Sequence, residues 1–112
     1  MDVNVLSALA EPNRLRIIEL LREGPRPVGE IAARLALRQP QVSKHLRVLT
    51  EAGLVAVHPA AQQRIYALRA EPFQALEAWL ETYRRFKEES YDRLDEHLQS
   101  LQTKEKKHGR QK

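Results

Sequence analysis

The residues best suited to chemistry in this chain lie in a stretch of 20 positions without an acid. Between Glu30 and Glu51 there is no Asp or Glu, although the other 92 of the 112 positions hold all 15. The stretch instead contains cations, amides and a hydroxyl: Arg34, Arg38, Gln39, Gln41, Ser43, Lys44, His45 and Arg47. Arg and Lys bind phosphate, and Gln, Ser and Arg bind base edges in the major groove. The composition therefore predicts a DNA-binding surface.

Two short helices joined by a tight turn would position these side chains. Apolar residues repeat at helical spacing over Val28–Leu35, and they do so again after Pro40. The second helix, expected over about 39–52, has an apolar face formed by Val42, Leu46 and Leu49. Its opposite face carries Pro40, Ser43, Lys44 and Arg47. This arrangement predicts a helix-turn-helix whose second helix enters the major groove.

Three other functions must be weighed against DNA binding. A solvated face on an ordinary helix bundle is common, but the missing acids argue against it. A winged-helix interaction module could use the same cations to bind an acidic protein partner, and this alternative stays open. An enzyme is not indicated, because the chain has no Gly-rich phosphate loop and no Cys, and because Ser43 and His45 point in different directions on a helix.

A β-hairpin is predicted directly after the second helix, over about 54–68. Gly53 supplies a helix stop, and Leu54–His58 and Arg64–Leu68 are β-prone runs. The connection 59–63 lacks Gly, so a longer, mobile loop is expected. As a wing, the hairpin would place Gln62, Gln63 and Arg64 on phosphate or in the minor groove. The alternative is a hairpin that only covers the core.

Two further helices are expected before the turn. One lies near Val5, Leu6 and Leu9, and the next begins at Pro12 and ends before Gly24. The second has a broad apolar stripe that we expect to be buried: Leu15, Ile17, Ile18, Leu20 and Leu21. Arg14 and Arg16 either contact the phosphate backbone or serve in packing and ion pairs, and the sequence does not decide between these roles.

The segment from Pro72 to about Gln102 contains no internal Gly or Pro, so it predicts one helix of roughly 30 residues. Its apolar stripe follows heptad spacing with one stutter near Lys87: Leu76, Leu80, Tyr83, Lys87, Tyr91, Leu94, Leu98 and Leu101. Two such helices would pair across a homodimer, with Leu6 and Leu9 contributing. Trp79 and Phe86 are expected to pack under the N-terminal helix, the alternative being a small-molecule pocket with Tyr83.

Charge divides the chain into three parts. Residues 1–69 hold ten basic and six acidic side chains, residues 70–101 four and eight, and residues 102–112 five and one, so the net charges are +4, −4 and +4. We therefore expect a DNA-binding domain over 1–71, a dimerisation helix over 72–102 and a basic, disordered tail over 103–112. A core this small would be completed by a partner chain.

Composition also limits the cofactors and the compartment. Zero cysteines exclude disulfides and thiolate metal sites and fit a cytosolic protein. No apolar run approaches the ~18 residues of a membrane span, and the acidic start at Asp2 does not resemble a signal peptide. We therefore expect a cytoplasmic protein without a cofactor.

Several linked motifs together resemble the ArsR/SmtB family of winged-helix transcriptional regulators. They occur in the family's order over residues 5 to about 69: 10–21, 28–32, 39–49, 52–55 and 64–68. The resemblance implies a mainly α fold with a small β-hairpin, a winged helix-turn-helix with a long C-terminal dimerisation helix. It also implies a homodimeric bacterial or archaeal repressor of a palindromic operator. Five residues fall at the family's groove-facing positions: Gln41, Ser43, Lys44, His45 and Arg47.

The resemblance raises metal sensing, but the sequence departs from both metal patterns of the family. The helix before the turn has no thiol, and the position after the wing that carries an Asp-x-His pair in metal-sensing relatives holds Phe73, Gln74 and Ala75. Asp95, His97 and His108 reproduce the spacing far downstream, which we interpret as coincidence. No metal is therefore expected. The effector, if one exists, would be a small molecule or a protein.

The chain is most similar to a subgroup of the family that lacks these metal sites. The similarity is carried by residues 37–41 and 72–80. Within the first of these segments, Arg38 replaces the Ser common at the start of the recognition helix. This loses a good N-cap but adds a cation near phosphate.

Overall fold

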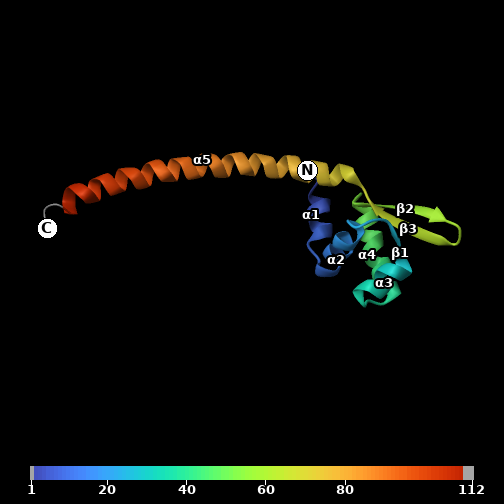
Figure 1. Cartoon of the computed structure of the whole chain (residues 1–112). Helices are drawn as coiled ribbons and strands as arrows, with labels where there is room; N and C mark the ends of the chain where they lie inside the picture. Colours follow the sequence, from blue (N-terminus) through green and yellow to red (C-terminus); the bar gives the residue numbers. More distant parts are fainter. Residues whose placement is uncertain (1, 110–112) are drawn as a thin grey trace. The chain divides into compact units, whose positions relative to one another are not determined.

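The computed structural model describes the backbone of residues 2–109 and the side chains of residues 2–102. The elements follow the order α1 (Val3–Leu9), α2 (Pro12–Leu21), β1 (Arg26–Pro27), α3 (Val28–Leu35), α4 (Gln39–Glu51), β2 (Val55–Ala60), β3 (Gln63–Leu68) and α5 (Ala70–Gly109) (Figure 1). Two compact units divide after Leu76. The predicted fold class, mainly α with a small hairpin and a long C-terminal helix, is confirmed.

The core of the first unit lies between α2, α3 and α4. The predicted apolar face of α4 is fully buried, since Val42, Leu46 and Leu49 are each 0% exposed. Ile17 and Ile31 meet this face from α2 and α3. One part of the predicted stripe on α2 is wrong, because Leu15 is 46% exposed. The buried stripe is narrower than expected, because α1, α3, α4 and β3 all contact α2 and still leave Leu15 half exposed.

The turn between α3 and α4 has the predicted bounds and is closed by backbone geometry. Ala36 adopts the left-handed conformation, with φ 55°, and the Leu37 amide donates to the Ala32 carbonyl at 3.0 Å. Arg38 occupies the N-cap of α4 without a side-chain cap hydrogen bond, and Pro40 lies in the first turn. The turn is therefore held by the αL residue and by the burial of α4 rather than by an N-cap side chain.

The hairpin is tighter than the sequence suggested. Strands β2 and β3 pair from Val55–Leu68 to Ala60–Gln63, which leaves only a two-residue turn at Ala61 and Gln62. The expected long loop over 59–63 is therefore wrong. Ala61 supplies the positive φ, 56°, that Gly would usually provide. Pro59 is tolerated because β2 is an edge strand.

A third strand was not predicted. β1 adds to the other side of β3 through the pairs Arg26–Tyr66 and Pro27–Ile65, so the sheet order is β1-β3-β2. Two residues are too few for a periodic signal, and a Pro-containing pair gives little β propensity. The strand ties the start of α3 to the wing.

The last helix extends further than predicted at both ends. It begins at Ala70 and reaches Gly109, seven residues beyond Gln102. The expected disorder of 103–112 is therefore wrong for 103–109, and 110–112 lie outside the described residues. The segment 103–108 has neither Gly nor Pro and contains three Lys and one Glu, which are good helix formers. Within the described part of the chain, no helix is long and apolar enough to cross a membrane.

The aromatic residues of α5 are exposed. Trp79 is 38% and Phe86 58% exposed, and their packing under the N-terminal helix stays a prediction. Trp79 packs edge-on against Tyr83, with ring centroids 4.8 Å apart. A shallow hollow among Trp79, Thr82, Tyr83 and Phe86 is lined by one helix alone. One helix face cannot enclose a small molecule, so the geometry gives no support to the ligand-pocket alternative.

Candidate nucleic-acid interface

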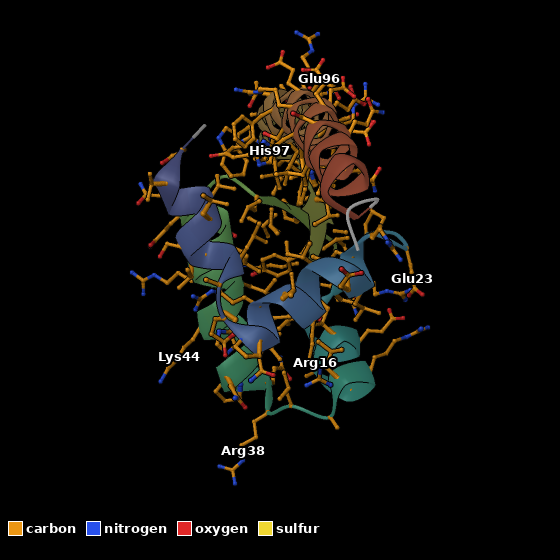
Figure 2. All side chains as sticks on the ribbon, turned by 90° about the vertical axis from the view of Figure 1, so that its left-hand side faces the viewer. Arg16, Glu23, Arg38, Lys44, Glu96 and His97 are labelled. Atoms are coloured by element: carbon orange, nitrogen blue, oxygen red, sulfur yellow. The ribbon has the colours of Figure 1, made fainter. Side chains whose placement is uncertain are left out.

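The outer face of α4 presents most of the predicted polar residues to solvent. Gln41, Ser43, Lys44 and Arg47 are all exposed, as is Gln39 at the start of the helix. Figure 2 shows Arg38 and Lys44 extending away from the ribbon into solvent. The opposite face of the same helix is fully buried, which fixes its orientation. A rigid helix with a free polar face has the geometry needed to enter a major groove.

Arg47 has an ion-pair partner on its own helix. Its Nε lies 3.2 Å from Glu51 Oε1, and both side chains are highly exposed. Such a pair is worth little in water, so phosphate or a guanine edge can replace the carboxylate. Glu51 is the acid that ends the acid-free stretch. It orients Arg47 without blocking it.

Arg64, on strand β3 of the wing, lines two hollows that also include residues of the recognition helix. A hollow on one side is lined by Gln39, Gln62, Gln63 and Arg64, together with residues 27–30. A second hollow is lined by Ser43, Arg47 and Arg64, with Val57 and Tyr66 from the strands. Both hollows include Arg64, so they adjoin. The structure thus brings the wing residues predicted from the sequence to the exposed side of α4.

Two apolar or aromatic residues in this groove were missed from the sequence. Val57 and Tyr66 are a cross-strand pair and line the hollow beside Arg47. The alternation of side chains along a strand could have predicted Tyr66. Arg64 and Tyr66 are two residues apart and therefore lie on the same face of β3. They give the groove an apolar wall.

Glu30, the acid at the edge of the groove, forms ion pairs with two arginines. Glu30 Oε1 lies 2.6 Å from Arg26 and 3.3 Å from Arg34. Arg26 also contacts Glu23 at 3.1 Å and has a largely buried side chain. Two arginines on one carboxylate leave the α3 side of the groove without net negative charge. Arg34 thus acts within the fold while remaining exposed.

His45 does not share the exposed face of α4. Its side chain is only 16% exposed, and Nδ1 lies 3.7 Å from Oε2 of Glu11 at the start of α2. Its predicted position facing the groove is therefore wrong. A helical wheel could have predicted this position. His45 and Leu49 are four residues apart and so lie only about 40° apart around the helix, which places His45 beside the buried face.

Arg14 and Arg16 hold helix ends. Arg14 Nε donates to the Ala8 carbonyl at 2.6 Å, at the end of α1. One guanidinium nitrogen of Arg16 donates to the Leu35 carbonyl at 2.9 Å, at the end of α3. Cations at helix C-termini satisfy free carbonyls and the helix dipole. The packing role left open by the sequence is the one these contacts favour.

The downstream Asp/His spacing has no geometric support. Asp95 and His97 lie on α5, and the side chain of His108 is outside the described residues. In the part of the chain whose side chains are described, no three His, Cys, Asp or Glu residues gather closely enough to hold a metal ion. The site residues that the geometry does bring together belong to α4 and the wing.

Comparison of the sequence with known proteins identifies DNA-binding regulators. A family described as "Helix-turn-helix domain" matches residues 9–58. The HTH-type transcriptional regulator Rv2034 of Mycobacterium tuberculosis is 42% identical over 76 residues, which are 68% of this chain and 71% of the relative. The transcriptional repressor SdpR of Bacillus subtilis is 31% identical over 69% of this chain and 86% of its own length.

Comparison of the fold gives the same result. The ArsR family transcriptional regulator RHA00566 superposes with a TM-score of 0.68 and 33% identity, covering 76% of this chain and 93% of that one. The homodimeric winged helix-turn-helix domain of Mb0332 from Mycobacterium bovis gives a TM-score of 0.62 and 30% identity, covering 71% and 74%. The chain therefore belongs to the ArsR/SmtB family of winged helix-turn-helix transcriptional regulators, which bind DNA and are not enzymes.

Proposed function

We propose that the protein is a homodimeric repressor that blocks a palindromic operator. The recognition helix α4 enters the major groove, and the wing β2–β3 lies along the backbone. The contacts come from Arg38, Gln39, Gln41, Ser43, Lys44, Arg47, Gln62, Gln63 and Arg64. One observation carries this proposal: the outer face of α4, which has no acid before Glu51, and the wing residue Arg64 line the same groove.

Dimerisation is supported by exposed apolar surface on α5. Leu80, Tyr83, Tyr91, Leu94 and Leu98 are each about half exposed, and they follow heptad spacing with Leu76. Leu6 on α1 is also exposed, whereas Leu9 packs partly against the core. A half-exposed leucine stripe favours a second copy of the chain, because it leaves apolar area in water. A two-fold dimer would then read two equivalent half-sites.

Repression without a thiolate-bound metal is the regulatory mode we propose. SdpR, a transcriptional repressor, matches along most of its length. The absence of cysteine removes thiolate ligands, so an effector would be a small molecule or a protein. Blocking an operator places the protein in the cytoplasm with the chromosome.

Selection of duplexes from a random library tests the proposal. The full chain should enrich a palindromic sequence. The selected duplex should then bind with steep salt dependence, losing about 10³-fold or more in affinity between roughly 50 and 200 mM salt if six or more phosphates are contacted. Fluorescence anisotropy measures this loss. A chain that enriches no sequence and binds an acidic protein instead would be an interaction module, and the proposal would be wrong.

Replacing the outer cations of α4 tests the assignment of its faces. Lys44→Ala and Arg47→Ala should each lower affinity for the selected duplex by about tenfold or more, since each complex loses two contacts. Arg22→Ala is the matched control, because Arg22 is exposed and pairs with Glu19 along α2 as Arg47 pairs with Glu51. Circular dichroism should show unchanged folding. Normal binding by both α4 variants would mean that another face contacts DNA.

A further inference from the structure

The contact between His45 and Glu11 joins the recognition helix to the start of α2. Glu11 Oε2 lies 3.7 Å from His45 Nδ1 and also accepts a hydrogen bond from the Arg14 amide at 2.8 Å. Glu11 is the N-cap residue of α2, so its carboxylate is held in place by the helix it caps. The imidazole of His45 therefore lies 3.7 Å from a carboxylate whose position is fixed by the helix that it caps.

The same corner includes the end of α1. The Arg14 side chain donates to the Ala8 carbonyl at 2.6 Å and reaches the Ser7 carbonyl at 3.4 Å. Arg14 thus contacts Glu11 through its amide and α1 through its guanidinium. Through these contacts, α1, α2 and α4 meet at one polar junction formed by Arg14, Glu11 and His45.

This junction lies beside the buried apolar face of α4. The buried face of the helix consists of Val42, Leu46 and Leu49, which fixes the side of α4 that faces the core, and the junction adds a second restraint on the angle of the helix about its axis. Attraction between the His45 imidazole and the fixed Glu11 carboxylate, whose nearest atoms are 3.7 Å apart, would favour one angle of the helix about its axis. Rotation of α4 would move Gln41, Ser43 and Lys44 together relative to base edges.

We propose that Glu11 and His45 form a positioning pair that sets the rotation of the recognition helix about its axis. His45 acts through Glu11 and contacts no base. The proposal rests on the DNA-binding function above. It deepens that function by naming the residues that set the angle at which the polar face of α4 meets the base edges.

Two substitutions separate positioning from DNA contact and from simple stability. Glu11→Gln keeps an oxygen to cap α2 but removes the charge, and His45→Leu removes the donor while retaining apolar bulk. Each should lower affinity for the library-selected duplex by about five- to thirtyfold, with two copies per complex, and should leave affinity for a scrambled duplex unchanged. The double variant should bind like either single variant, because both break one contact. His45→Asn, which keeps a donor near the place of Nδ1, should restore most of the affinity.

Affinities are measured where circular dichroism shows every variant fully folded. The imidazole ¹⁵N resonances of His45, followed by NMR, should not shift when the selected duplex is added to the wild-type protein. Normal affinity in Glu11→Gln with a loss in His45→Leu, together with shifted resonances, would show a direct DNA contact and overturn the pair. Lower thermal stability with unchanged affinity in both variants would reduce the pair to a structural contact. If the wild-type chain selects no duplex, the proposed function fails first, and the two failures are thus distinguishable.

Discussion

Val42→Asp is expected to unfold the winged-helix unit. Val42 is 0% exposed and lies at the centre of the α2, α3 and α4 core. Among the described residues the buried core contains no polar or charged residue, so the new carboxylate would have no polar partner there. Burying an unpaired carboxylate costs several kcal/mol, against a total stability of about 5–15 kcal/mol for a domain. Thermal melting followed by circular dichroism should show a large loss of stability or no cooperative transition.

The matched control for this substitution lies on the same helix. Val48→Asp makes the same chemical change at a residue that is 38% exposed, where water can solvate the carboxylate. Its melting temperature should stay within a few degrees of that of the wild-type protein. A folded Val42→Asp protein beside an unfolded Val48→Asp protein would show that the two faces of α4 are reversed.

The parts of the fold that local sequence patterns determine were predicted well. The bounds of α3, and those of α4 to within one residue, follow from apolar spacing and from the prolines at their starts. The buried face of α4 followed from the same periodicity. In these segments one periodic signal, repeated over two or more turns, specifies both the helix and its orientation.

The errors occurred where tertiary contacts override local signals. Ala61 adopts a positive φ that its sequence does not announce, because strand pairing on both sides closes the turn. β1 exists only because β3 offers it an unpaired edge. Leu15 looks like a core residue, yet 46% of it is exposed in the described structure. The pairing of β1 and the exposure of Leu15 depend on residues distant in sequence, which a pattern along the chain does not contain, whereas the turn at Ala61 depends on the register of the two strands that flank it.

The candidate site divides in the same way. Lys44 and Arg47 were placed correctly on the exposed face by the helical wheel, whereas His45, included by the acid-free composition and by the resemblance, lies toward Glu11 with a side chain that is 16% exposed. The inward direction of His45 depends on Glu11, 34 positions earlier in the chain. The wing residue Arg64 was predicted by type, but the groove that it shares with Arg47 needed the strand register.

The second large effect concerns assembly through α5. Replacing Leu94 and Leu98 with Gln should convert the dimer to a monomer at micromolar concentration, as measured by sedimentation equilibrium. These leucines are 51% and 46% exposed in the single chain and lie on the heptad stripe. Pairing across a dimer would remove their apolar surface from water, at about 25 cal/mol per Å² of area buried. Two substitutions per chain remove four leucines from the seam, which is a large part of its apolar surface.

The control puts the same residue on the opposite side of α5. Asp92→Gln with Glu96→Gln should leave the dimer intact, because positions 92 and 96 lie roughly 160–200° around the helix from Leu94. The monomeric variant should also lose affinity for the selected duplex by about 10²-fold or more, because the second half-site is no longer bound at high effective concentration. The two losses must coincide if one seam serves both purposes. A variant that stays dimeric would place the interface elsewhere, whereas a monomer with normal affinity would show that each half-site is read independently and that the operator need not be palindromic.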